Sequence, residues 1–156
     1  MKKDDVKKLV LSLGACFAAA AIGSFFTMPS IATWYASLAK PAFAPPNWMF
    51  APAWTLLYAM MGIALFLVWR EAAKKGAAMT AFGGQLFLNA LWSAAFFGAH
   101  SPFFGFVVIV LLWLTILDTI IEFRKISEAA AWLLVPYFFW VSFAACLNYS
   151  IWMLNP

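Results

Sequence analysis

Residues 103–123 read FFGFVVIVLLWLTILDTIIEF, and no charged residue precedes Asp118 in this stretch. An apolar run of about 20 residues has the length of a helix that crosses the hydrocarbon core of a bilayer. The strands of a membrane barrel would instead alternate apolar and polar residues over roughly 10 positions. The stretch therefore predicts a transmembrane α-helix.

Four more apolar runs divide the rest of the chain, which has 156 residues, 66% of them hydrophobic and only 10% charged. A soluble domain carries about 25% charged residues, so most of this surface is expected to face lipid. We predict an all-α integral membrane protein, a five-transmembrane-helix bundle that forms one domain over residues 1–156. The predicted helices cover about residues 9–28, 48–69, 77–97, 103–123 and 128–154, and Pro29 closes the first.

The basic residues indicate how the chain lies in the membrane. Nine of the ten lie in the amino-terminal tail and in the links after the second and fourth runs, whereas Lys40 lies on the opposite side. Because basic loops stay in the cytoplasm, we predict a cytoplasmic amino terminus and an external carboxyl terminus, in a membrane that the sequence does not specify. The net charge of +4 is thus a topology signal. No nucleic-acid partner is expected, since no soluble basic face is available.

The predicted loop of residues 29–47 is rich in proline and aromatic residues. Residues 34–48 read WYASLAKPAFAPPNW. One interpretation is a belt of aromatic side chains at the membrane surface. The other is a semi-rigid lid over one end of the bundle, which the four prolines of the loop favour because each fixes the backbone torsion φ. We call residues 29–47 the lid loop.

Amide and aromatic side chains share faces of three predicted helices. Amides in lipid are costly unless they turn inward and are paired, and one interpretation is simple hydrogen bonding between helices. The other is an apolar pocket with a few polar anchors, suited to a large planar ligand. The residues, helix by helix, are Trp54 and Tyr58, then Gln85, Asn89, Trp92 and Phe96, then Trp140, Ala144 and Asn148.

Conventional catalytic and metal-binding patterns are missing from the sequence. His100 is the only histidine, so a histidine metal site is not expected. The two cysteines have no metal-ligand spacing, and no glycine-rich phosphate loop occurs. Asp118 and Glu122, near the end of the fourth helix, either pair with nearby basic residues at the membrane surface or mark a proton or cation path.

Small residues on the third predicted helix indicate self-association. Ala77, Ala81 and Gly84 follow one another at i, i+4 and i+7, a spacing that allows two helix backbones to approach closely. We predict a homodimer through this helix.

Four segments, in order along the chain, carry a resemblance to a known family. The lid loop reads W34-Y-x-x-L-x-K-P-x-F-x-P-P46. The later segments read P52-A-W-T-L-L-Y58, Q85-L-x-L-N89-x-L-W-S93 and W132-L-L-x-P-Y-x-x-W140-x-x-F-A-A-x-L-N148. Together they resemble the TspO/MBR family of tryptophan-rich sensory proteins, translocator proteins and peripheral-type benzodiazepine receptors.

The resemblance implies a five-helix bundle, usually a homodimer, whose pocket under the lid loop takes porphyrins such as protoporphyrin IX or haem as ligands, with no obligatory cofactor. The family's cholesterol pattern needs a basic residue after a tyrosine near the carboxyl end. None follows Tyr149, which puts sterol binding in doubt. The motif match implies ligand contacts at Trp34, Trp54, Tyr58, Asn89, Trp140 and Ala144, and the helix-face pattern adds Trp92.

Three functions therefore stay open. The first is a membrane receptor or sensor of tetrapyrroles. The second is a light-dependent porphyrin-degrading enzyme in the same pocket, for which the resemblance implies Trp34 and Trp140 as the catalytic pair. The third, a transporter of porphyrin or another amphipathic ligand, ranks last because inverted repeats and broken helices are not evident.

Overall fold

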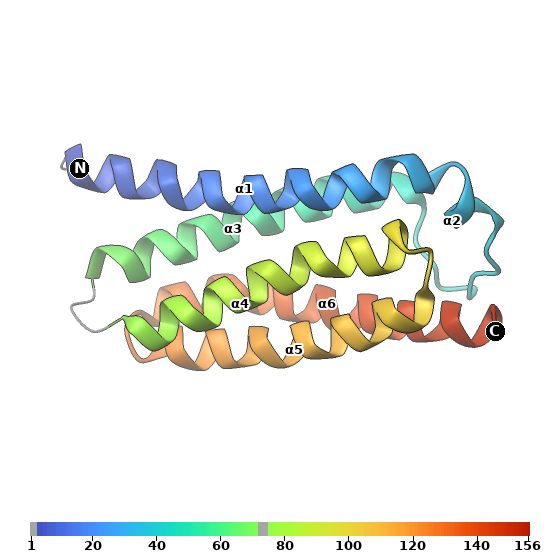
Figure 1. Ribbon diagram of the computed structural model, residues 1–156. Coiled ribbons are helices and arrows are strands. Elements are labelled where there is room, and N and C mark those ends of the chain that lie inside the picture. The colour runs from blue at the N-terminus through green and yellow to red at the C-terminus, as the bar shows by residue number, and fades with distance from the viewer. Residues whose placement is uncertain (1–2, 72–74) are drawn as a thin grey trace.

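The computed structural model describes residues 3–71 and 75–156, and the elements in these ranges are all helical (Figure 1). Five long helices lie side by side, and a short helix and a 3-10 turn sit in the lid loop at one end. In chain order the elements are α1 Lys3–Ile31, α2 Trp34–Ser37, η1 Asn47–Met49, α3 Phe50–Glu71, α4 Gly76–Ser93, η2 Ala94–Gly98, α5 Pro102–Arg124 and α6 Glu128–Leu154.

Four helices within the described ranges are long and apolar enough to cross a membrane. They are α1, α3 together with η1, α5 and α6. The remaining long helix, α4, contains Gln85 and Asn89 among its 18 residues, and these amides lower its hydropathy. The all-α prediction is therefore confirmed, whereas the crossing of α4 stays a prediction.

Helix α1 differs from the prediction at both ends. It begins at Lys3, six positions before residue 9, and Asp4 and Asp5 lie in its first turn, where acidic side chains favour the helix dipole. The prediction that Pro29 closes the helix was wrong, because α1 continues to Ile31. A proline removes its own N–H bond and crowds the carbonyl four residues earlier, but the helix continues for one more half-turn, and the Thr33 hydroxyl donates to the carbonyl of Pro29 at 2.9 Å.

Serine caps define the starts of the last two helices. The Ser101 hydroxyl accepts from the backbone N–H of Phe104 at 3.3 Å before α5, which has proline at its first position. Ser127 caps α6 in the same way, accepting from Ala130 at 3.3 Å. Such caps satisfy N–H groups that lack partners within the helix. Each cap thus fixes the point at which the chain leaves a connecting turn.

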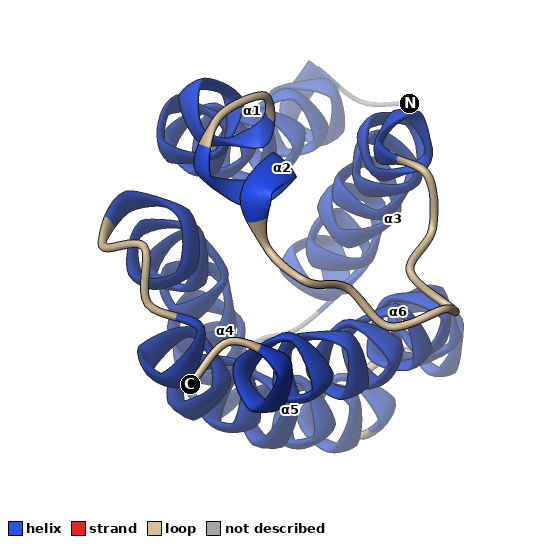
Figure 2. Cartoon of the chain, turned by 90° about the vertical axis from the view of Figure 1, so that its right-hand side faces the viewer, coloured by secondary structure: helices blue, strands red, loops and turns tan. Residues whose placement is uncertain are grey.

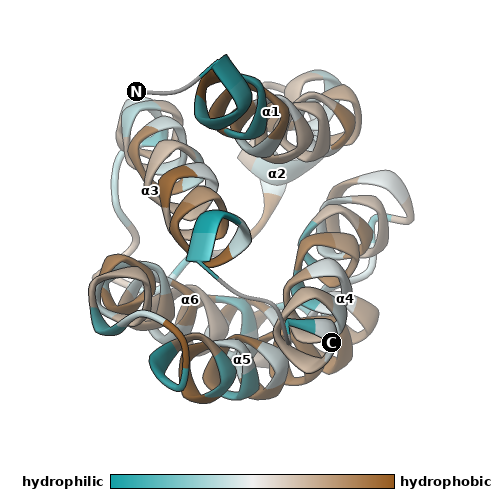
Figure 3. Cartoon of the chain, turned by 90° about the vertical axis from the view of Figure 1, so that its left-hand side faces the viewer, coloured by the Kyte–Doolittle hydropathy of each residue, from teal (hydrophilic) through white to brown (hydrophobic). Residues whose placement is uncertain are grey.

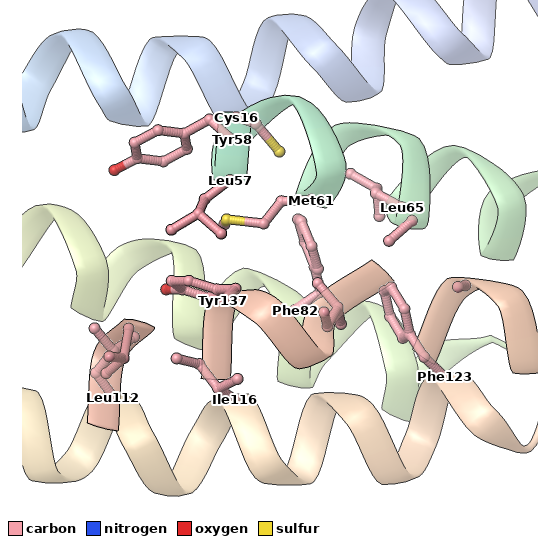
Figure 4. Packing of buried hydrophobic residues seen from close by; sticks show 14 of the residues in the cluster. Cys16, Leu57, Tyr58, Met61, Leu65, Phe82, Leu112, Ile116, Phe123 and Tyr137 are labelled. Carbon is pink, nitrogen blue, oxygen red and sulfur yellow. The ribbon is translucent and has the colours of Figure 1, made fainter. Parts of the chain in front are cut away.

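Side chains from all five long helices meet in the interior (Figure 4). Helix α1 packs on α3 and α4, α5 packs on α4 and α6, and α3 packs on α6. Met61, Ile116, Phe123 and Tyr137 are fully buried in this core. A second aromatic cluster closes the bundle beneath the lid loop and includes Tyr35, with Phe96 and Phe97 from η2 and Leu147 and Ile151 from α6.

The two ends of the bundle differ in polarity. Hydrophilic segments gather at the end that holds the start of α1, the end of α3 and the turn between α5 and α6 (Figure 3). The lid loop crosses the other end, between α2 and α3, and passes close to the end of α6 (Figure 2). The side chain of Asn155 binds the loop there, and it accepts from the N–H of Ala39 at 3.0 Å and donates to its carbonyl at 2.9 Å.

Candidate functional site

A cavity of about 420 Å³ lies inside the bundle under the lid loop. Its walls come from α1, α3, α4, η2 and α6, and Tyr35 covers it from α2. Pockets of this size, lined mainly by apolar and aromatic side chains with a few polar groups, are typical small-molecule sites. This cavity is therefore the candidate functional site.

Tryptophans from two helices form an aromatic wall of the cavity. Trp54 of α3 and Trp92 of α4 lie with their rings 6.5 Å apart and 30° from parallel, and both line the cavity. The Trp92 indole donates to Asn148 at 3.0 Å, and Asn148 donates to the carbonyl of Pro102 at 2.7 Å. These bonds hold the Trp92 ring in one orientation, because the indole N–H is bound to Asn148 and the Asn148 side chain is itself held by the Pro102 carbonyl.

The polar anchors of the cavity belong to a buried chain of hydrogen bonds. The Tyr58 hydroxyl donates to Asn89 Oδ1 at 2.5 Å, and Asn89 Nδ2 donates to the hydroxyl of Tyr137 at 2.7 Å. Tyr137 then donates to Gln85 Oε1 at 3.0 Å. Tyr58 and Asn89 line the cavity, whereas Tyr137 and Gln85 lie behind it.

Five of the seven predicted ligand-binding residues line the cavity, namely Trp54, Tyr58, Asn89, Trp92 and Ala144. Trp34 and Trp140 are not among its lining residues. The Trp34 ring instead stacks on His100 with 4.7 Å between ring centroids. Trp140 packs edge-on against Trp54 at 6.5 Å, and its buried Nε1 has no hydrogen-bond partner.

Other lining residues were not predicted from the sequence. Tyr35, only 4% exposed, covers the cavity in place of its neighbour Trp34. Burial raises the pKa of the Tyr35 hydroxyl above its ordinary value, so this group stays neutral at physiological pH. Seven residues of α1 also line the cavity. The sequence of α1 gave no signal for them, because Ser24 and Thr27 are the only polar residues among the seven.

The cavity also opens sideways between α1 and α3. Ser24 and Met28 on α1, and Ala51 and Thr55 on α3, line it and are at the same time exposed on the surface. Met28 is 73% exposed. The opening lies on the half of the bundle nearest the lid loop, and none of the lining residues carries a charge.

Comparison with known proteins identifies the family. The sequence profile of the TspO/MBR family matches residues 12–153. The chain belongs to the TspO/MBR family. It is 48% identical to the tryptophan-rich protein TspO of Chlorobaculum tepidum over 156 residues, which cover 97% of this chain and 98% of that protein.

More distant relatives match over most of their length. The human translocator protein is 37% identical over 151 residues, covering 94% of this chain and 86% of the relative. A tryptophan-rich sensory protein of Cereibacter sphaeroides is 34% identical over 143 residues, covering 92% and 88%. Together with the four apolar helices, membership of the TspO/MBR family shows that the chain is a multi-pass integral membrane protein.

The acidic pair of α5 lies away from the cavity. Neither Asp118 nor Glu122 is a lining residue. Glu122 pairs with Lys125 at 2.5 Å, as in the first of the two interpretations of this pair. A pairing at the helix end accounts for the charge of Glu122 without any part in the site.

Proposed function

We propose that the protein is a membrane receptor or sensor that binds tetrapyrroles such as protoporphyrin IX or haem in the cavity under the lid loop. The aromatic wall carries this proposal, because the near-parallel rings of Trp54 and Trp92 offer flat apolar surface to a flat ligand. The word "sensory" in the name of the Cereibacter relative agrees with a signalling role.

The ligand is expected to be held mainly by ring contacts. No histidine or cysteine lines the cavity in the described part of the chain, so of the axial ligands that haem iron takes in proteins only methionine and tyrosine line it, as Met28, Tyr35 and Tyr58. Metal-free protoporphyrin IX is therefore the better first probe. The binding needs no resident cofactor, since the porphyrin is itself the ligand.

A fifth crossing belongs to this proposal. The amides of α4 face inward, with Gln85 1% and Asn89 2% exposed, while Phe87 on its outer face is 66% exposed. The run of α4 and η2 from residue 76 to residue 98 is long enough for the roughly 30 Å hydrocarbon core. Helix α4 would thus cross the membrane with its polar groups directed away from lipid.

Porphyrin degradation is the second candidate, and it ranks below binding. Trp34 and Trp140 are the proposed electron donors, yet the lining residue Trp54 lies between Trp140 and the cavity. Electron donation to a photoexcited ligand depends on close contact, so both indoles would act through intervening rings. Binding makes no such demand on them.

Titration with protoporphyrin IX tests the proposal through the quenching of tryptophan emission. Wild-type protein should show saturable quenching, and Trp54→Ala should weaken affinity about tenfold, since one aromatic contact contributes roughly 0.5–1.5 kcal/mol beyond its buried area. Trp132→Ala is the matched control, because Trp132 is 65% exposed and lies outside the cavity. Equal affinity in wild type and Trp54→Ala, with both proteins folded, would place the ligand elsewhere.

A further inference from the structure

The hydrogen-bond chain behind the cavity has a direction. Tyr58 donates to Asn89, Asn89 donates to Tyr137, and Tyr137 donates to Gln85. All four side chains are 6% exposed or less, so no solvent competes for these bonds. A tyrosine hydroxyl has one hydrogen and two lone pairs. The single hydrogen of Tyr58 is therefore committed to Asn89.

This direction decides what the cavity wall offers to a ligand. Because the O–H of Tyr58 points at Asn89, the Tyr58 oxygen presents only lone pairs to the cavity that it lines. The Tyr58 oxygen can therefore accept a hydrogen bond from a ligand but cannot donate one. A ligand with an N–H or O–H group here gains a bond, whereas a carbonyl placed there meets another oxygen.

The orientation of the two amides sets the direction, because the same groups can bond in reverse order. If both amides turned over, Tyr137 would donate to Asn89, Asn89 to Tyr58, and Tyr58 into the cavity. Gln85 is the terminal member and accepts through Oε1, while its Nε2 has no partner. With its carbonyl turned to Tyr137, Gln85 accepts the hydrogen of Tyr137, and every bond between Gln85 and the cavity then points the same way.

We propose that Gln85 is a specificity-determining residue, which selects flat aromatic ligands that carry a hydrogen-bond donor although it does not line the cavity itself. The inference rests on the proposed function, since it requires that the cavity takes a ligand. It deepens that function by naming the chemistry of the ligand edge at Tyr58.

Carbazole and 9-fluorenone are suitable probes for the purified full chain in detergent. They share a flat three-ring outline, but carbazole has an N–H donor where fluorenone has a carbonyl acceptor. The quantity to measure is the ratio of their Kd values, obtained by quenching of tryptophan emission. Wild type should bind carbazole about five- to tenfold more tightly than fluorenone, the ratio that one net hydrogen bond gives.

The decisive variant is Gln85→Met, which keeps the length of the side chain but removes its strong acceptor. The best acceptor left for Tyr137 is Asn89 Oδ1, so the chain should reverse and Tyr58 should donate into the cavity. We expect the preference to shift about tenfold or more towards fluorenone. Ser150→Ala is the control, because Ser150 lies outside the cavity and its hydroxyl bonds only to Cys146 within α6, and its ratio should equal that of wild type.

A double-mutant cycle separates this mechanism from a general structural effect. Tyr58→Phe should bring the ratio near one, and adding Gln85→Met to Tyr58→Phe should not move it further. A second variant, Tyr137→Phe, cuts the chain and should also bring the ratio towards one if Gln85→Met does not fold.

Two results would overturn the inference alone. One is an unchanged ratio in Gln85→Met and Tyr137→Phe, and the other is a shift that persists in the Tyr58→Phe background, in each case with protoporphyrin IX still bound by wild type. Failure of wild type to bind protoporphyrin IX and both probes would overturn the proposed function together with the inference.

Discussion

Asn155 connects two segments that are 116 positions apart in the sequence. Its amide bonds both the N–H and the carbonyl of Ala39 in the lid loop, and it also donates to the carbonyl of Ile151 at 2.8 Å. These bonds hold the loop against the end of α6. A single side chain therefore fixes the backbone of a segment that has little regular structure of its own.

Replacing Asn155 by alanine should release the lid loop. Two hydrogen bonds to Ala39 are lost, each contributing about 0.5–1.5 kcal/mol, so backbone amides over residues 38–46 should exchange hydrogen for deuterium roughly tenfold faster. Mass spectrometry of peptides from this segment measures the rate. Ser150→Ala is the control, because the Ser150 hydroxyl bonds only within α6, to Cys146. Equal protection in Asn155→Ala and wild type would mean that other contacts hold the loop.

The sequence predicts site residues well where a helix presents them. Trp54 and Tyr58 are four positions apart on α3, so periodicity places both on the cavity face. Tyr35 could not be distinguished from Trp34 in this way, because a four-residue helix within a loop has no sustained period. Trp140 lies on the predicted helix, but it packs edge-on against Trp54 and does not line the cavity. Which of two neighbouring side chains reaches the cavity depends on packing, and residue spacing does not predict it.

At the level of elements, the closest approach of α1 and α3 depends on Gly62. A Cβ atom at this position would lie 2.7 Å from Leu13 Cδ2 and 3.0 Å from Leu13 Cα. The second atom is backbone and cannot rotate away. The contact therefore requires glycine.

Gly62→Ala should lower thermal stability, since relief of the clash means moving α1 as a whole. Overpacking of this kind costs about 1–3 kcal/mol. Gly14→Ala is the matched control on α1, because no atom lies within 4 Å of the added Cβ, and alanine favours a helix by about 0.5–1 kcal/mol. Thermal unfolding in detergent should show a lower Tm for Gly62→Ala than for Gly14→Ala. A Tm at or above that of wild type in Gly62→Ala would contradict the rigid contact.

Helix α4 presents small residues with open space around them. No atom lies within 4 Å of a Cβ built at Gly83 or Gly84, so this part of α4 has room for a second helix. We expect a homodimer through this face, and Gly84→Leu should abolish chemical crosslinking between protomers. The matched change Gly14→Leu, in equally open space on α1, should leave crosslinking intact. Crosslinking of Gly84→Leu at the wild-type level would remove α4 from the interface.

For elements as a whole, the sequence predicts the helical class better than the ends of the helices. The length of an apolar run can be read directly from the sequence, and it does not depend on how the helices pack. The end of α1 was missed because the helix continues past Pro29, where the Thr33 hydroxyl donates to the Pro29 carbonyl. That bond comes from a residue outside the run itself.

Across the whole molecule, charge separates the two ends of the bundle. The start of α1, the end of α3 and the turn between α5 and α6 form the hydrophilic end in Figure 3, and among the described basic residues these segments hold Lys3, Lys7, Lys8, Arg70, Arg124 and Lys125. Lys40 belongs to the lid loop at the other end. The lid loop and the cavity therefore lie on the side with few charges. From the positive-inside rule we expect this side to face away from the cytoplasm.

Reporter fusions test this orientation. Alkaline phosphatase is active only outside the cytoplasm, and fluorescent protein folds mainly within it, so fusion at the carboxyl end should give phosphatase activity and no fluorescence. Fusion at the amino end should give the reverse. Adding lysines to the lid loop should weaken the bias, because it raises the basic charge of the outer side. The opposite reporter pattern at both ends would invert the orientation.

The sideways opening between α1 and α3 changes how affinity has to be expressed. Exposed lining residues such as Met28 and Thr55 place the mouth of the cavity on the surface that lipid or detergent covers. The reservoir for an apolar ligand is then the hydrocarbon phase, and occupancy follows the ligand's mole fraction in it. At a fixed total amount of ligand, doubling the detergent should halve that fraction and move the midpoint of a titration twofold. Dissociation constants per litre of water would therefore differ between preparations that bind equally well.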